Sequence, residues 1–120
     1  MSFEQLSSLV RNNRVADLEA MLDNPETRIN VNQADEGSGN TLLIVAAQNG
    51  NKRCAKLLLR RGAALNQTNA KGNSCLHFAF AFGYTELGHY LISLGANSAL
   101  RNSSGLTPFE GVSRESLMRL

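Results

Sequence analysis

A self-match at an offset of 33 residues constrains this chain more than any other feature of its sequence. Three glycines, Gly39, Gly72 and Gly105, are spaced by that offset. Other columns repeat with them: a hydroxyl at 41, 74 and 107, leucine or phenylalanine at 43, 76 and 109, and a small residue at 46, 79 and 112. A fixed period of this size predicts stacked supersecondary units. Function is then expected on a surface of the stack.

Length and composition narrow the possible classes of protein. The 120 residues and 13.0 kDa make one domain, without room for a separate catalytic domain beside the repeats. Hydrophobic residues at 42% and charged residues at 18% indicate a globular chain and exclude disorder. A net charge of +2 is far from the dense Lys/Arg footprint of nucleic-acid-binding proteins. We therefore expect no nucleic-acid partner.

The two cysteines and the absence of apolar runs bear on the compartment. Cys54 and Cys75 form no CxxC pair, so they are interpreted as small buried thiols. The chain has no basic-then-apolar leader and no run of about 18 apolar residues, which a membrane span needs. The sequence predicts an intracellular, cytoplasmic setting without a membrane partner.

Within one period the apolar pattern predicts two helices. An apolar run over 76–82 ends at Gly83, and a second run with helical spacing over 87–92 ends before Gly95. Glycine tolerates the positive φ at a helix exit, so each unit is expected to fold as helix, tight turn, helix and loop. Ser74 stands before the first run as an N-cap, as Thr41 does one period earlier. Pro108 is expected at the first position of the last helix.

The first and second helices of each unit carry the pattern of a known family. Residues 41–47, 74–79 and 107–109 are similar to the T-P-L-H-x-A-A opening of ankyrin repeats. Residues 57–66 resemble the L-L-L-x-x-G-A-D-V-N ending of the second helix in that family. The resemblance covers nearly the whole chain. It implies an all-α ankyrin-repeat solenoid of stacked antiparallel helix pairs with β-hairpin-like fingers.

The resemblance also assigns structural roles. Residues 66–73 would form a finger projecting from the helix pairs. Ser74 and His77 would tie the first turn of the third repeat by hydrogen bonding, as the family's threonine and histidine do. Ile44 replaces that histidine in the second repeat, so a hydrophobic contact is expected there.

The repeat register divides the domain 1–120 into a cap repeat 2–38, two repeats 39–71 and 72–104, and a terminal half-repeat 105–120. Ser2 and Gln5 resemble a capping box at the start of the cap repeat. An insertion at 24–27 displaces this repeat from register. One more extra residue predicts that its finger, residues 30–39, is longer or looser than the second finger.

The C-terminal end leaves two alternatives open. Ser116 stands where a turn glycine is expected, and only a short apolar tail ending at Leu120 follows. Either a single helix from Pro108 to Leu120 caps the stack, or the chain is a fragment whose next helix lies in a larger protein. The apolar tail, which includes Leu117 and Met118, favours a fragment.

No catalytic constellation is visible. His77 is assigned to the helix opening, and His89 is interpreted as a surface or inter-repeat residue. The H-E-x-x-H, G-x-S-x-G and phosphate-loop patterns are missing. The stretch 37–41 lacks the lysine and preceding strand of a phosphate cradle and is interpreted as a hairpin tip. We predict no enzymatic activity, no cofactor and no metal site.

Three phenylalanines alternate on the first helix of the third repeat. Phe78, Phe80 and Phe82 cannot share one helix face, because successive members lie about 200° apart. Phe80 is expected to pack between repeats. Phe82 is hypothesised to be an exposed anchor for a partner, and the alternative is that it only packs on Asn49 and Arg114.

A basic stripe runs along the second helix of the second repeat. Lys52, Lys56 and Arg60 follow i, i+4, i+8 spacing, with Arg53 and Arg61 beside them. We interpret the stripe as a solvated outer face. The alternative is a site for an anionic partner or nucleic acid.

The sequence therefore predicts a monomeric, non-catalytic protein–protein interaction module, an adaptor or scaffold, that binds a partner protein of unknown identity through its concave surface and fingers. The alternative is a structural or regulatory ankyrin segment of a larger enzyme or cytoskeletal protein. By family position, the predicted contact residues are Ser38, Asn40, Gln48, Asn49, Lys71, Asn73, Ala81, Phe82, Arg101, Ser103, Ser104 and Leu106.

Overall fold

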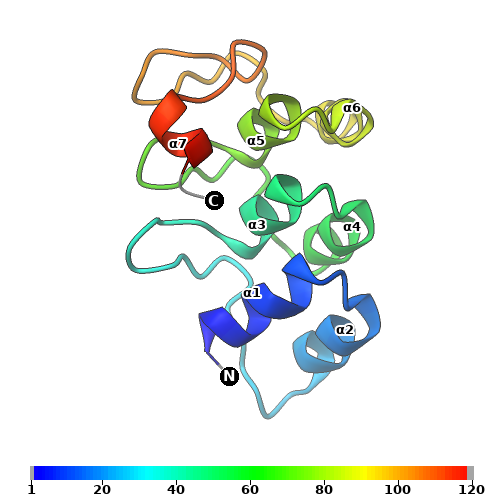
Figure 1. Cartoon of the computed structure of the whole chain (residues 1–120). Coiled ribbons are helices and arrows are strands. Elements are labelled where there is room, and N and C mark those ends of the chain that lie inside the picture. Colours follow the sequence, from blue (N-terminus) through cyan, green and yellow to red (C-terminus); the bar gives the residue numbers. More distant parts are fainter. Residues whose placement is uncertain (1, 119–120) are drawn as a thin grey trace.

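The structure is a computed structural model that describes residues 2–118. Its helices stack in two layers (Figure 1). The inner layer contains α1 (Phe3–Arg11), α3 (Leu42–Gln48) and α5 (Cys75–Ala81). The outer layer contains α2 (Val15–Asp23), α4 (Lys52–Arg60) and α6 (Thr85–Ser93). A separate short helix, α7 (Arg114–Met118), ends the described chain.

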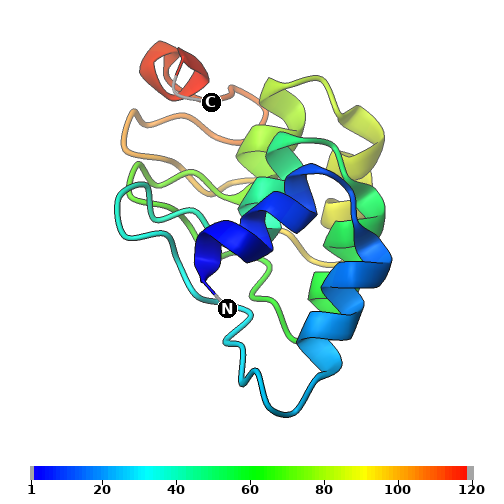
Figure 2. The same cartoon turned by 60° about the horizontal axis from the view of Figure 1, so that its bottom comes forward.

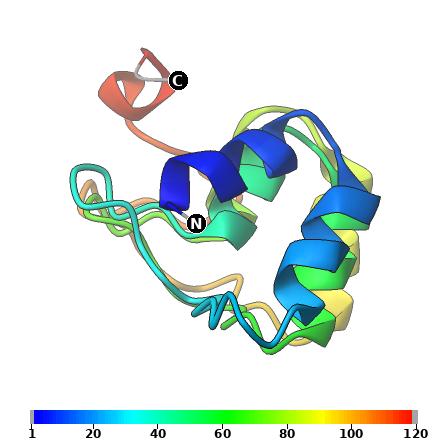
Figure 3. The ribbon, with the colours of Figure 1, turned by 90° about the horizontal axis from the view of Figure 1, so that it is seen from below.

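Each inner helix packs antiparallel against the outer helix that follows it, and α3 contacts the inner helices α1 and α5 on its two sides. Seen along the stack, the outer helices lie behind one another, and so do the loops that project from the inner layer (Figure 3). This is the all-α solenoid of stacked antiparallel helix pairs with projecting fingers that the sequence predicts. The principal extents of 41 × 29 × 20 Å describe a short, curved stack.

The inner helices begin with side-chain caps. Ser2 and Gln5 form the expected capping box, in which the backbone N–H of Ser2 donates to Oε1 of Gln5 at 2.8 Å. Thr41 accepts from the backbone N–H of Ile44, and Ser74 accepts from that of His77. The predicted N-caps are therefore confirmed, and each satisfies an N–H that the helix itself leaves free.

The outer helices begin without side-chain caps, because their first residues follow tight turns directly. Gly50 and Gly83 adopt positive φ in the turns before α4 and α6, and Asn13 takes that conformation before α2. Asn51, at the start of α4, instead donates its side-chain amide to the carbonyl of Val10 in α1 at 2.7 Å. This bond joins the outer helix of one unit to the inner helix of the previous one.

Three fingers project from the inner layer and lie side by side (Figure 2). One backbone hydrogen bond joins each finger to the next: Ala70 N–H to Ser38 C=O at 3.0 Å, and Ser103 N–H to Lys71 C=O at 2.9 Å. Within the described residues, the isolated bridge Ala34↔Thr41 is the only strand-like pairing. The first finger is one residue longer than the second, as predicted, because Asp35 pairs with Asn40 whereas Asn69 pairs with Asn73.

Asparagine side chains join the fingers a second time. Asn69 donates to Oδ1 of Asn40 at 2.9 Å, and Asn102 donates to Oδ1 of Asn73 at 2.7 Å. The side-chain oxygen of Asn102 also accepts from the backbone N–H of Leu106 in its own finger at 3.0 Å. Asn69 and Asn102 therefore hold the shape of their own fingers and fix the distance to the preceding finger.

The core runs through the whole stack between the two helical layers. Leu58 and Leu91, which share one repeat column, are fully buried in α4 and α6. Ile44 is buried where the next repeat has His77, so a hydrophobic contact replaces the histidine as expected. His77 accepts from Ser74 N–H through Nδ1 at 3.2 Å. Its Nε2 lies 2.8 Å from the carbonyl oxygen of Leu106, in the next finger.

The predicted helix from Pro108 to Leu120 is wrong over the described residues. A single turn over 108–110 ends at Gly111, whose φ is +103°. The carbonyl of Thr107 accepts from both Glu110 and Gly111, which closes the turn early. Ser113 then accepts from Ser116 N–H and starts α7. Glycine and a new capping serine thus outweigh the apolar pattern, and residues 119–120 lie outside the described chain.

None of the described helices has the length and apolarity needed to cross a membrane.

Candidate functional site

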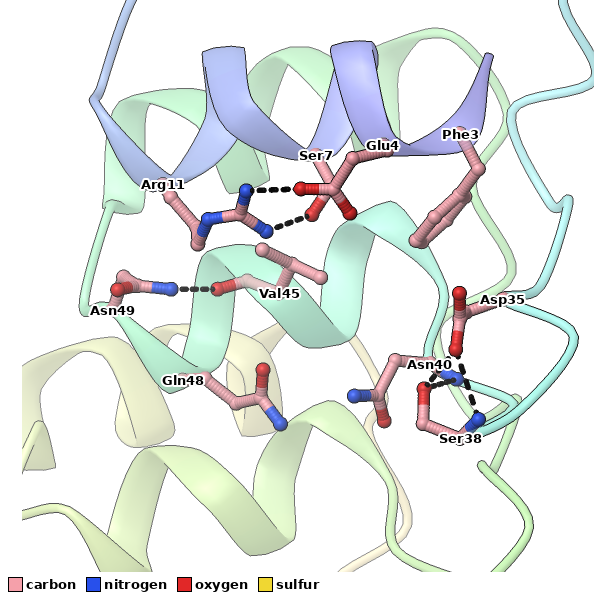
Figure 4. Close-up of a pocket in the computed structure, with 10 residues that line it drawn as sticks. All are labelled: Phe3, Glu4, Ser7, Arg11, Asp35, Ser38, Asn40, Val45, Gln48 and Asn49. Carbon is pink, nitrogen blue, oxygen red and sulfur yellow. Dashed lines mark hydrogen bonds and ion pairs between the residues drawn. The ribbon is translucent and has the colours of Figure 1, made fainter. Parts of the chain in front are cut away.

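The concave face of the stack is hollowed between α1, the first finger and α3 (Figure 4). This N-terminal hollow has a volume of about 330 Å³. Four predicted contact residues, Ser38, Asn40, Gln48 and Asn49, line it together. The structure therefore gathers the contact residues predicted from the second repeat around one cavity.

Asp35 and Ser38 shape the finger side of the N-terminal hollow. Ser38 donates its backbone N–H and its hydroxyl to Oδ2 of Asp35, at 2.9 and 2.8 Å. The hydroxyl oxygen of Ser38 accepts from Asn40 N–H at 3.1 Å. The donors from Ser38 lower the pKa of Asp35, so this side chain is a carboxylate at neutral pH.

The opposite side of the N-terminal hollow comes from α1. Arg11 forms an ion pair with Glu4, with Nη2 and Oε1 2.7 Å apart. Its other terminal nitrogen, Nη1, donates to the hydroxyl of Ser7 at 2.7 Å. Figure 4 shows these side chains facing α3 across the hollow. Arg11 is therefore held by its own helix.

A second, smaller hollow of about 120 Å³ lies beside the first. Ser38, Asn40 and Gln48 line both hollows, and Lys71 joins them from the second finger. Ser116 of α7 forms part of the wall of the smaller hollow. The C-terminal segment thus borders the concave face.

The structure differs from the sequence expectation at Asn73. This residue was expected to offer a surface contact, but it is only 1% exposed. Its side chain accepts from Asn102 at 2.7 Å and donates to Ser116 of α7 at 3.3 Å. The family position was therefore correct for the finger, whereas the side chain is used to join two fingers and α7.

The aromatic residues of the third repeat divide as their helical spacing requires. Phe80 contacts Phe109 of the next repeat, with ring centroids 4.9 Å apart, and so packs between repeats as expected. Phe82 is half-buried, and its ring stacks on Phe78 at 5.9 Å. Ala81 beside it is also half-buried. Phe82 and Ala81 lie outside both hollows, and a role for Phe82 as an anchor stays a prediction.

The contact residues predicted on the third finger do not reach either hollow. Arg101 donates to the carbonyl of Gly105 at 2.7 Å and lies 3.5 Å from the carboxylate of Glu110. Ser103 and Ser104 are exposed, and Leu106 is half-buried. The third finger therefore forms a separate part of the concave side.

Sequence reasoning missed the residues that α1 contributes to the N-terminal hollow. Arg11 directly precedes the C-cap Asn12 of α1, as Gln48 directly precedes the C-cap Asn49 of α3. Matching the helix ends, instead of the 33-residue offset, would have placed Arg11 in the same column as Gln48. The insertion at 24–27 hid this relation, because it shifts the first repeat out of register.

Three residues of the basic stripe, two on α4 and its C-cap Arg61, contact the neighbouring outer helices. Lys52 lies 3.2 Å from Glu86 of α6, and Arg61 lies 2.7 Å from Asp23 of α2. The ammonium groups of Lys52 and Lys56 also lie over the ring of Tyr90, 4.8 and 5.3 Å from its centroid. These contacts favour the interpretation of the stripe as an outer face that joins repeats.

The buried titratable groups do not form a reactive set. Burial raises the pKa of the Cys75 thiol to about 12 and also raises that of Cys54. Burial lowers the pKa of His77, so its imidazole is neutral. Among residues 2–118, no three His, Cys, Asp or Glu side chains gather closely enough to hold a metal ion. The concave face therefore offers hydrogen bonding and charge for recognition.

The sequence matches a model described as ankyrin repeats in three copies over residues 6–102. Human protein phosphatase 1 regulatory subunit 27 is 41% identical over 71 residues, which cover 59% of this chain and 46% of that protein. Mouse B-cell lymphoma 3 protein homolog is 36% identical over 90 residues, 75% of this chain and 20% of that protein. Caenorhabditis elegans BRCA1-associated RING domain protein 1 is 32% identical over 103 residues, which cover 85% of this chain and 14% of that protein. The match spans less than half the length of each of these relatives.

Proposed function

The chain belongs to the ankyrin-repeat family, and from this premise we propose that it is a non-catalytic adaptor or scaffold that binds a partner protein on its concave face. One observation carries the proposal: the contact residues predicted from the second repeat, Ser38, Asn40, Gln48 and Asn49, line one hollow of about 330 Å³. Gln48 is half-buried, and its amide makes no hydrogen bond within the described chain. The hollow therefore has polar groups available to a partner.

The rigidity of the fingers supports this role. Backbone hydrogen bonds and asparagine side chains join each finger to the next. A surface that is already ordered loses little conformational entropy when a partner binds. A small polar hollow on a rigid scaffold suits selective recognition better than catalysis.

One relative supplies a candidate partner. A protein phosphatase 1 regulatory subunit shares 41% identity over 59% of this chain. Protein phosphatase 1 is therefore the first purified protein to test. Because the match covers only 46% of that relative, a regulatory segment within a larger enzyme or cytoskeletal protein is the alternative role. A native product that continues well beyond Leu120 would favour this alternative.

The cellular setting is part of the same proposal. Two free, buried thiols, Cys54 and Cys75, suit a reducing compartment, and we place the protein in the cytoplasm as a monomer. The pairing of the α4 stripe with its neighbours argues for a protein partner over nucleic acid.

The test compares the same substitution at two glutamines, one inside the hollow and one outside it. Gln48→Arg places a long cation in the hollow, whereas Gln33→Arg adds the same group at an exposed position that lines neither hollow. Binding is measured with purified protein phosphatase 1 and, in parallel, by quantitative capture from cell extract. We expect Gln48→Arg to lower the amount of captured partner at least tenfold and Gln33→Arg to leave that amount unchanged. Equal binding by both variants would refute the concave site.

A further inference from the structure

The N-terminal hollow carries one uncompensated charge. Glu4 and Arg11 cancel each other through their ion pair at 2.7 Å, and the other terminal nitrogen of Arg11 is used by Ser7. Asp35 is the third charged residue that lines the hollow. Hydrogen bonds from Ser38 keep it ionised, because they lower its pKa. The hollow therefore has a net charge of about −1 at neutral pH.

Hydrogen-bond acceptors remain available beside this charge. Both hydrogen bonds from Ser38 end on Oδ2 of Asp35, a lesser backbone interaction from Gly37 also favours the carboxylate, and within residues 2–118 no further side chain donates to it. The side-chain amide of Gln48 is likewise without a partner in the described chain. Figure 4 shows the Gln48 side chain on the side of α3 away from α1, next to the side chain of Asn40. An incoming donor can thus reach a carboxylate and an amide oxygen in one cavity.

The remaining lining is apolar. The ring of Phe3 and the side chain of Val45 form part of the wall, and Val45 is buried beneath the polar groups. Long basic side chains combine an aliphatic stem with a charged head, so they can cover apolar surface and place the charge on a carboxylate. An acidic side chain would be repelled by Asp35, and a purely apolar one would cover the carboxylate without supplying an opposite charge.

We propose that the N-terminal hollow receives a basic side chain of the bound protein, arginine in preference to lysine, with its charged head on Asp35 and its stem along Phe3 and Val45. Arginine is favoured because its planar guanidinium can bond one carboxylate through two parallel N–H donors, whereas a lysine ammonium offers a single point charge. The inference rests on the proposed function and specifies the chemistry that the partner must present.

The first experiment uses a small probe in place of the unidentified partner. Nα-acetyl-arginine amide is titrated into the ¹⁵N-labelled chain, with Nα-acetyl-citrulline amide as a control of the same shape without the charge. We expect weak saturable binding, on the order of millimolar for a ligand of this size, with chemical shift changes centred on Asn40 and Gln48. Nα-acetyl-lysine amide is expected to bind more weakly than arginine, and citrulline at least five times more weakly. Equal shifts with arginine and citrulline, or shifts centred elsewhere, would overturn the proposal.

Two neighbouring substitutions test the carboxylate itself. Asp35→Asn removes the charge and keeps an oxygen for Ser38, whereas Glu36→Gln removes a charge from an exposed residue outside the hollow. We expect Asp35→Asn to weaken arginine binding at least fivefold and Glu36→Gln to leave it within twofold.

A third variant keeps the test decisive if the first finger opens in Asp35→Asn. Gln48→Arg lies on α3, leaves the finger unchanged and places a cation of the chain's own in the hollow. It should abolish the arginine shifts. Persisting shifts in Gln48→Arg would contradict the proposal whatever Asp35→Asn does.

The outcomes separate this inference from the proposed function. Arginine binding without any captured protein would support the hollow's chemistry and count against an adaptor role. A captured partner that depends on Gln48 but tolerates Asp35→Asn, together with no arginine binding, would support the adaptor role and overturn the basic side chain.

Discussion

At the scale of single residues, two glycines with the same backbone conformation have different surroundings. Gly72 and Gly105 both have a φ of +76°, which glycine adopts without strain. A Cβ on Gly72 would lie 2.9 Å from the backbone nitrogen of Ser103 in the next finger, whereas a Cβ on Gly105 would meet nothing within 4 Å. Both positions therefore need glycine for its positive φ. At Gly72 the close approach of the next finger is a second reason, because it leaves no room for a Cβ.

This difference predicts unequal costs for the same substitution. Gly105→Ala should lower the free energy of unfolding by about 1 to 2 kcal/mol, the usual cost of a left-handed residue with a Cβ. Gly72→Ala should cost about 1 to 3 kcal/mol more, because backbone atoms must move to admit the methyl group. Urea denaturation of both variants measures the difference. Equal losses would mean that the fingers separate freely.

His77 is a second residue whose role is set by its partners. The Ser74 N–H donates to Nδ1, so the proton of the neutral ring lies on Nε2 and is donated to the carbonyl of Leu106. Burial lowers the pKa of His77, because the charged form is poorly solvated there. Protonation of Nδ1 would also remove the acceptor for Ser74. The imidazole must therefore stay neutral for the cap to hold.

The lowered pKa of His77 predicts a stability that depends on pH. Below about pH 6.5, His77 binds a proton in the unfolded chain but stays neutral in the native state. The free energy of unfolding therefore falls as pH decreases toward 5. Gln5 forms the same cap on Ser2 in the first helix without titrating, so His77→Gln is the matched variant. Thermal unfolding between pH 5 and 7.5 should slope for the native chain and flatten for His77→Gln. Parallel curves would assign the slope to other groups.

At the scale of elements, each outer helix presents one face to the core and one to its neighbours. In α4, Leu58 is 0% exposed, and Leu59 next to it is half-buried. The polar side of the same helix pairs with α2 and α6 through Arg61 and Lys52. These ion pairs are partly exposed, and such pairs contribute little to stability. The buried leucines hold the outer layer in place.

The two leucines allow a matched test of that statement. Leu58→Ala should lower the free energy of unfolding by about 2 to 5 kcal/mol, because it removes buried atoms and leaves a cavity. Leu59→Ala in the same helix should cost clearly less. Chemical denaturation at one pH compares the two. A mild effect of Leu58→Ala would show that the helical layers can close around the missing side chain.

The C-terminal element depends on contacts that no helix pattern contains. α7 meets the second finger through Ser116, which accepts from Asn73 at 3.3 Å, and through Glu115, which lies 3.4 Å from Lys71. Lys71 and Asn73 were both predicted to contact a partner. α7 therefore borders the surface that a partner would share with the second finger.

At the scale of the whole molecule, the helices α1–α6 of each unit pack on those of the adjacent units, and α7 reaches further, to Lys71 of the second finger. α3 packs against both α1 and α5, so it lies at the centre of the stack. Beyond the third finger, Phe109 is 61% exposed, and the open space beside Gly105 contrasts with the crowded space beside Gly72. Stability in such stacks is close to a sum over units and their interfaces. The unit that contains α3 has an interface on each side, whereas the described part of the C-terminal half-repeat has an interface on one side only.

This arrangement predicts a gradient of protection along the chain. Backbone amides of α3 should exchange with solvent last, because they open only when the stack unfolds, and those after Gly105 should exchange first. Native-state hydrogen exchange followed by NMR measures both groups in one sample. Equal protection of α3 and residues 106–113 would mean that the chain opens as a single unit.

Most of the architecture could be predicted from the sequence, because it depends on local patterns. The glycine exits and the hydroxyl caps each act within a few residues of their own helix, and the helices of the repeats lie where these signals place them, whereas α7 does not start at Pro108. The longer first finger also follows from counting residues. Ser38, Asn40, Gln48 and Asn49 were predicted from their columns, and they line one hollow.

The tertiary structure decided the rest, because it depends on contacts between segments that the repeat does not relate. The burial of Asn73 requires Asn102 and Ser116, which lie 29 and 43 residues away. The charge of the hollow depends on Arg11, which the insertion at 24–27 displaces from the repeat register, and on Asp35, which the extra residue of the first finger displaces. A repeat pattern determines which side chains share a column. Which of them stays available to a partner depends on the atoms that distant segments place beside it.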